Sequence, residues 1–99
     1  MHHTVAQPRS GSVVRLARGD TLELLLGQRS ARHHWEVAMA PYGMDLLEDA
    51  PRAGTSGRGT TRRMMFRAMR NGGGILRLER SHPLEASPEQ LDLLVAVGA

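Results

Sequence analysis

The sequence contains no cysteine and no lysine, and only three of its 99 residues are aromatic. Without cysteine the chain can form neither a disulfide nor a thiolate metal site, and it has no cysteine nucleophile. The absence of lysine beside thirteen arginines fits two explanations. One is codon bias in a GC-rich genome; the other is use of the arginine fork, which suits phosphate or carboxylate.

Long apolar runs are also missing. No stretch approaches the roughly 18 residues of a membrane-spanning helix, so we expect no membrane partner. The start of the chain holds paired histidines but no apolar segment typical of a signal peptide, and residues 1–11 are expected to be a flexible N-terminus. The location would be cytoplasmic if the chain is complete, and secreted or periplasmic if a leader has been removed.

A chain of 99 residues allows one domain with a modest core, which we place at residues 12–99. The net charge of +3 is too small to argue for nucleic acid by itself. Single-strand binders also need aromatic platforms, and the aromatic residues here are expected in the core. We interpret Arg62, Arg63, Arg67 and Arg70 as a solvated strand face, and expect no nucleic-acid partner.

Apolar and polar residues alternate at a period of two in several segments, which is typical of β-strands with one buried face. Strands are expected at residues 12–17, 21–26, 34–40, 60–69, 75–80 and 91–97. The predicted inward-facing residues are Leu22, Leu24, Leu26, Trp35, Val37, Met39, Met64, Phe66, Ala68, Leu91, Leu93, Val95 and Val97. With turns between them, these strands predict an all-β, immunoglobulin-like sandwich of about seven to eight strands.

Two segments remain open at this level. Residues 44–48 fit a short strand or one helical turn. Residues 88–97 begin with helix-start chemistry at Ser87 and Pro88, although their alternation favours a strand. Residues 49–59 are rich in glycine and predict a long loop, of the kind that is usually functional or disordered. Residues 71–74, Asn-Gly-Gly-Gly, predict a β-hairpin turn.

Catalytic and cofactor motifs are not found. No serine stands in a Gly-x-Ser-x-Gly elbow. Neighbours on a strand point to opposite faces, so His33 and His34 make a poor metal chelate. The glycine-rich stretch at residues 54–60 lacks the lysine of a phosphate-binding loop. We therefore expect a protein that is not an enzyme, with no metal and no cofactor.

The order of these features resembles the chagasin-type inhibitors of papain-like cysteine proteases over residues 13–97. The matching pieces are Gly19-Asp20-Thr21-Leu22, Trp35-Glu36-Val37, Gly57-Arg58-Gly59-Thr60, Phe66-Arg67-Ala68, the glycines at 72–74, Ile75-Leu76-Arg77-Leu78-Glu79, Pro83 and the alternating strand 91–97. The resemblance implies an immunoglobulin-like domain whose three loops, gathered at one end, plug the protease cleft. It also implies a non-covalent mechanism in which no cleavable bond is offered.

The loops depart from the family pattern in part. The central loop of the family usually reads Asn-Pro-Thr-Thr-Gly, and its third loop carries Arg-Pro followed by an aromatic residue; the second is rich in glycine. The resemblance assigns the partner contacts to Gln28, Arg29, Ser30, Ala31 and Arg32, to Gly57, Arg58 and Gly59, and to His82, Pro83 and Leu84. The partner implied is a protein, a papain-like cysteine protease. The alternative is an accessory or partner-binding protein on the same scaffold that has lost protease inhibition.

Overall fold

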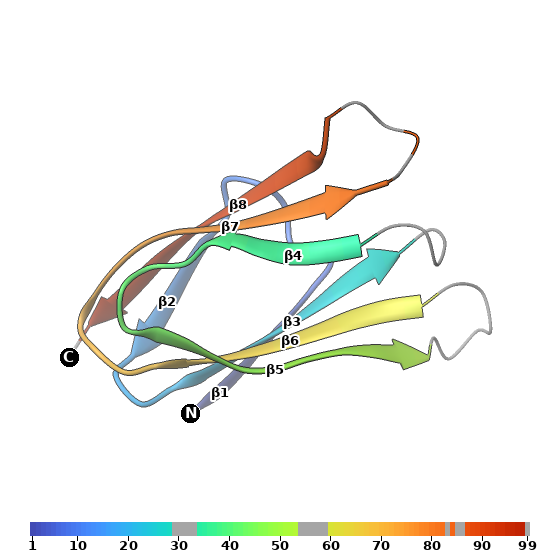
Figure 1. The fold of residues 1–99 in the computed structure, drawn as a ribbon. Helices are drawn as coiled ribbons and strands as arrows, with labels where there is room; N and C mark the ends of the chain where they lie inside the picture. The colour runs from blue at the N-terminus through green and yellow to red at the C-terminus, as the bar shows by residue number, and fades with distance from the viewer. Residues whose placement is uncertain (29–33, 54–59, 83, 85–86, 99) are drawn as a thin grey trace.

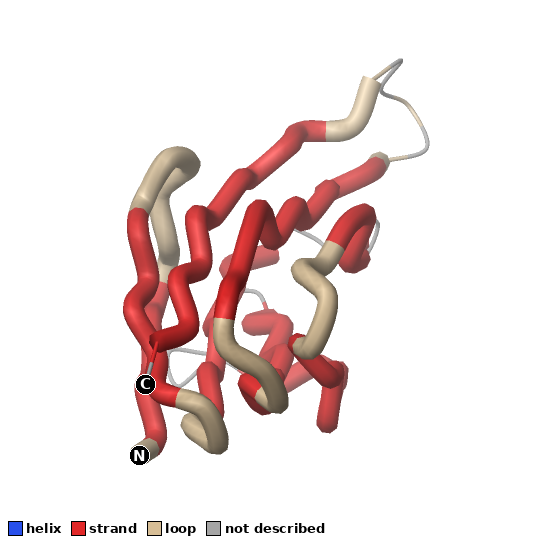
Figure 2. The backbone as a smooth tube through the Cα atoms, turned by 90° about the vertical axis from the view of Figure 1, so that its left-hand side faces the viewer, coloured by secondary structure: helices blue, strands red, loops and turns tan. Residues whose placement is uncertain are grey.

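The computed structural model describes the chain except residues 29–33, 54–59, 83, 85–86 and 99, and it describes only the backbone of residues 28, 51–53 and 60. Eight strands account for most of the described residues (Figure 2). They are β1 (His2–Ala6), β2 (Val13–Ala17), β3 (Thr21–Gln28), β4 (His34–Met39), β5 (Met44–Ala53), β6 (Thr60–Ala68), β7 (Gly72–Ser81) and β8 (Glu89–Gly98). The described residues include no helix suited to cross a membrane.

The strands form two four-stranded sheets that pack face to face (Figure 1). Sheet A has the order β1-β3-β6-β5, and sheet B has the order β2-β8-β7-β4. β1 runs parallel to β3 and β2 runs parallel to β8, whereas the other neighbours are antiparallel. The predicted all-β sandwich is confirmed.

The core lies between the sheets and follows the predicted alternation closely. Leu22, Leu24 and Phe66 are 0% exposed, and each such side chain contributes about 1.5–3 kcal/mol through its burial. One predicted core residue is wrong, because Met39 is 43% exposed. A β-bulge between Val37 and Met39 shifts the alternation by one residue, which turns Met39 outward.

Two segments that the sequence left open are strands. Residues 44–48 begin β5, which continues to Ala53 beside β6, so the strand extends into the expected loop. Residues 88–97 lie almost wholly in β8, and the helical alternative is wrong. The physical reason is pairing: β8 lies between β2 and β7, so both of its edges are satisfied by sheet hydrogen bonds.

The predicted hairpin at residues 71–74 is also wrong, because β6 belongs to sheet A and β7 to sheet B. The glycines instead begin β7 while the chain crosses between the sheets. Gly73 has a φ of +126°, and a Cβ added there would lie 2.0 Å from the carbonyl oxygen of Val95. Glycine is required at residue 73 so that the backbones of β7 and β8 can approach closely.

The N-terminal residues form a strand, in contrast to the flexible segment expected over residues 1–11. β1 pairs with β3 in a parallel register that begins with His2 opposite Thr21. Side chains reinforce the pairing: His2 Nδ1 lies 2.6 Å from Thr21 Oγ1, and His3 Nε2 lies 2.9 Å from Asp20 Oδ2. The paired histidines therefore contact a neighbouring strand and its preceding turn.

The outer face of sheet A carries a partly buried ion pair between Glu23 and Arg63. The hydrogen bond from Arg63 holds the pKa of Glu23 below its ordinary value of 4.5, and a hydrogen bond from Thr4 acts in the same direction. Arg63 also donates to Glu48 at 2.8 Å. The unfolded chain, with the higher pKa, therefore binds the proton of Glu23 more readily than the folded chain does.

We expect acidification to destabilise the fold through this carboxylate. Because the folded pKa is the lower one, the stabilisation is present above about pH 4.5 and is lost as the pH falls through the folded pKa. Urea denaturation near neutral pH and at about pH 3 measures the loss. Glu23→Gln should be less stable near neutral pH and should show a smaller loss on acidification; an unchanged pH dependence in this variant would contradict the assignment.

Candidate functional site

Three connections leave the sandwich at one end, on the right-hand side of Figure 1. In sheet A, the strand-end residues Gln28 and Ala53 both pair with Thr60. In sheet B, His34 pairs with Ser81, and β8 begins at Glu89 beside Arg80. The ends of β3, β5 and β7 and the starts of β4, β6 and β8 therefore lie at one end of the sandwich, which we call the loop end.

Trp35 joins the two sheets directly beneath the loop end. Its indole Nε1 donates a 3.0 Å hydrogen bond to the carbonyl oxygen of Gly27 in β3, and its side chain is part of the core. The guanidinium of Arg80 lies over the Trp35 ring, 5.6 Å from the ring centroid. Arg80 also pairs with Glu89 across β7 and β8. The strand ends that carry the loops are therefore held by specific contacts.

The sequence analysis placed Arg62 on a solvated strand face and gave Arg80 no role, but both lie in this layer. Arg62 continues the inward alternation of Met64 and Phe66, and Arg80 continues that of Leu76 and Leu78. Their side chains are 24% and 17% exposed. Arg62 pairs with Asp49 and Arg80 with Glu89, because a charge at the margin of the core needs a partner. The sequence does contain a signal for these two residues. In each strand, the inward position that follows the apolar ones is occupied by an arginine.

The predicted contact residues have different outcomes. Gln28 is the last residue of β3, whereas residues 29–32, 57–59 and Pro83 lie outside the described residues. His82 is half-buried, and its Nδ1 accepts a 3.1 Å hydrogen bond from the backbone N–H of Leu84. The Leu84 side chain is 80% exposed, an apolar group presented to solvent at the loop end.

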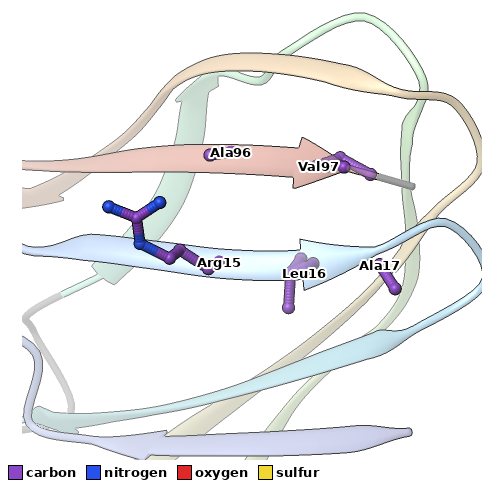
Figure 3. Close-up of a pocket in the computed structure, with 6 residues that line it drawn as sticks. Arg15, Leu16, Ala17, Ala96 and Val97 are labelled. Atoms are coloured by element: carbon purple, nitrogen blue, oxygen red, sulfur yellow. The ribbon is translucent and has the colours of Figure 1, made fainter.

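A hollow beside β2 and β8 (Figure 3) is lined by aliphatic residues, glycine and a single titratable residue, Arg15. It therefore offers no acid–base pair. Among the described residues no group of three histidine or carboxylate side chains is placed to hold a metal. At the loop end, Leu84 presents an exposed apolar side chain close to the hydrogen-bonded strand ends.

Comparison with known proteins gives structural likeness without sequence likeness. No family model matches the chain, and no curated protein matches its sequence. Among solved structures, the cysteine protease inhibitor EhICP2 from Entamoeba histolytica superposes with a TM-score of 0.81, covering 98% of this chain and 95% of the inhibitor at 17% identity. The chain has the chagasin-type fold.

A second solved structure, that of amebosin, matches this fold with a TM-score of 0.72 and 18% identity, covering 99% of both chains. At these identities the likeness is one of fold.

Proposed function

We propose that this chain inhibits a papain-like cysteine protease by inserting the three loops of the loop end into the active-site cleft. The observation that carries the proposal is that β3, β5 and β7 end, and β4, β6 and β8 begin, at the same end of a sandwich with the chagasin-type fold. These are the connections to which the resemblance assigns protease contacts. A cysteine protease inhibitor of the same fold, EhICP2, supports the proposal.

The support beneath the loops explains how such binding is stabilised. Association costs free energy when flexible groups become ordered, so a rigid base lowers that cost. Here the Trp35–Gly27 hydrogen bond and the Arg80–Glu89 ion pair fix the strand ends before binding. Recognition residues on loops positioned by a rigid sandwich are a common arrangement. Inhibition is then non-covalent, with the loops excluding substrate from the cleft.

Leu84 is the described contact residue best suited to anchor the complex. Its side chain is 80% exposed, and burying an apolar side chain in a pocket of the partner supplies binding free energy. Arg29, Arg32 and Arg58 add guanidinium groups to the loop sequences, and such groups bind carboxylates with two hydrogen bonds. The proposed surface thus combines an apolar anchor with cationic neighbours.

A titration of papain tests the proposal. We expect measurable inhibition that is weaker than that of a family member with the full loop motifs, because the central loop lacks the usual proline and glycine and loses more conformational freedom on binding. Replacing residues 28–32 with Asn-Pro-Thr-Thr-Gly should tighten inhibition by about tenfold or more. Nanomolar inhibition by the unmodified chain would show that the altered loop carries no such cost.

Single substitutions identify the surface used. Arg32→Ala and Leu84→Ala should each weaken inhibition while changing the free energy of unfolding by no more than about 0.5 kcal/mol, as is usual for surface residues. Mass spectrometry of the inhibitor after incubation with protease should show neither cleavage nor an adduct. If neither variant affects binding, the loop end is not the contact surface and the proposal fails.

The altered loops favour a second candidate, an accessory protein that binds a different partner with the same surface. His82-Pro83-Leu84 stands where the family carries Arg-Pro and an aromatic residue, and Leu84 is presented to solvent. A pull-down from the source cell with the unmodified chain and the Leu84→Ala variant distinguishes the two candidates. Recovery of a cysteine protease by the unmodified chain alone supports inhibition, and recovery of another protein with the same dependence supports the accessory role.

A further inference from the structure

The described arginines fall into two groups. Four of them form ion pairs with nearby carboxylates: Arg62, Arg63, Arg77 and Arg80. The others are exposed, with no carboxylate oxygen of a described residue within 4.0 Å. Three of these, Arg18, Arg67 and Arg70, gather at the end of the sandwich opposite the loop end. Together with Tyr42 and Met69, which are 79% and 48% exposed, they form what we call the turn-end patch.

The turn-end patch is built from three connections that are bonded to one another. In the β2–β3 turn, Gly19 N–H donates to the carbonyl oxygen of Ala68 at 2.6 Å, and Ala68 N–H donates to that of Asp20 at 2.9 Å. In the β4–β5 turn, the carbonyl oxygen of Gly43 accepts from Met69 N–H at 2.7 Å. The three connections are therefore one hydrogen-bonded unit, and the arginines stand on a fixed base.

Close packing also determines where Arg70 lies. Gly43 has a φ of +89°, and a Cβ added there would lie 2.9 Å from the Cβ of Arg70. This approach places the Arg70 guanidinium over the Tyr42 ring, 4.9 Å from its centroid. A guanidinium stacked on an aromatic face keeps its N–H donors free at the edge of the stack, where they can bind an anion.

The surface between these side chains is hollowed. One shallow hollow is lined by Arg18 and Arg67, and a second by Tyr42 and Arg70; Met69 lines both. A ligand segment lying across Met69 would thus pass from one pair of side chains to the other. Asp45 faces the second hollow and pairs in register with Arg67, so one negative charge borders the patch.

We propose that the turn-end patch binds an acidic segment of a protein partner, in which carboxylates flank an apolar side chain. Arginine forks match carboxylates with two parallel hydrogen bonds, and Met69 with the edge of Tyr42 offers the apolar contact. Tyrosine, methionine and arginine are also the residue types enriched in protein–protein interfaces. A nucleic-acid strand needs several stacking platforms, whereas this patch has the one ring of Tyr42, already covered by Arg70.

This surface is separate from the proposed protease contacts, so the two can be occupied together. The chain would then link the enzyme bound at the loop end to an acidic partner bound at the turn-end patch. The inference does not depend on protease inhibition. Neutralising the patch arginines should leave papain inhibition unchanged, and altering residues 28–32 should leave acidic-peptide binding unchanged.

Fluorescence anisotropy with a labelled Glu-Glu-Leu-Glu-Glu peptide, flanked by Gly-Ser spacers, tests the proposal on the full chain. We expect it to bind at least about tenfold more tightly than the matched Gln-Gln-Leu-Gln-Gln peptide, because charge-assisted hydrogen bonds are lost in the latter. Binding should weaken as the salt concentration rises from about 0.05 M to about 0.5 M. Equal affinity for the two peptides would overturn the proposal.

Matched variants locate the site. Arg67→Gln and Arg70→Gln should each lower the affinity for the acidic peptide by about tenfold. Arg9→Gln, which removes an equal charge from the β1–β2 connection, should change it little. Asp45→Asn should raise the affinity by about threefold, a gain that misfolding cannot produce.

The remaining outcomes overturn the assignment. If Arg9→Gln lowers the affinity for the acidic peptide as much as Arg67→Gln does, the binding depends on net charge and not on the turn-end patch. Tighter binding to oligothymidylate or to phosphatidylserine vesicles than to the acidic peptide would assign the patch to another class of partner.

Discussion

Replacing Gly73 with alanine will destabilise the domain by about 4 kcal/mol, combining backbone strain at positive φ with overpacking against a neighbouring strand. The added Cβ would lie 2.0 Å from the carbonyl oxygen of Val95 and 2.9 Å from the carbonyl carbon. These atoms are backbone and lie within the β7–β8 ladder, so they cannot rotate away as a side chain would. A domain stabilised by about 5–15 kcal/mol would lose much of its stability. Urea denaturation measures the change.

Gly72→Ala is the matched control. Gly72 has a similar φ of +123°, but no atom lies within 4 Å of a Cβ built there. This variant should therefore carry only the backbone strain, about 1–3 kcal/mol. The difference between the two variants isolates the contact with Val95. If both variants lose the same stability, the close approach of β7 and β8 is not the reason for glycine at residue 73.

Trp35→Ala should cost about 3–5 kcal/mol, the usual range for removing a large core aromatic. The substitution removes packing between the sheets, the hydrogen bond to Gly27 and the ring beneath Arg80. Because these contacts hold the strand ends of the loop end, inhibition should also weaken in protein that remains folded. Thermal or urea denaturation measures the first effect, and the papain titration measures the second.

Trp35→Phe separates packing from hydrogen bonding. It retains an aromatic ring in the core but removes the donor to Gly27, so we expect a cost of about 1–3 kcal/mol from the unpaired carbonyl and the lost volume. Trp35 is the only tryptophan, which makes its fluorescence a direct probe of the site. Emission typical of a water-exposed indole in the folded protein would contradict its burial.

The sequence by itself determined the class of the fold and most of its core. A strand with one buried face must alternate at a period of two, and this local rule identified Leu22, Leu24 and Leu26, as well as Leu91 to Val97. The absence of cysteine and of catalytic motifs likewise limited the chemistry that the chain can perform. The order of short motifs was enough to suggest the chagasin-type fold.

Only the tertiary structure decided what depends on contacts between distant residues. Residues 71–74 are compatible with a hairpin in isolation, and the assignment of β6 and β7 to different sheets is made by their partners, β3 and β8. The bulge that exposes Met39 arises from the register of β4 against β7, and β1 is ordered by its contacts with β3.

The arginines show the same division. Composition supplied thirteen of them, but their spacing did not reveal which would meet a carboxylate. Folding brings Asp92 beside Arg77 and Glu23 beside Arg63, and it leaves Arg18, Arg67 and Arg70 in the turn-end patch without an ion pair to any described carboxylate. A charge is neutralised by an opposite charge within a few ångströms in space. In a β-sandwich, residues paired on neighbouring strands are distant in the sequence, so these partners come from distant parts of the chain.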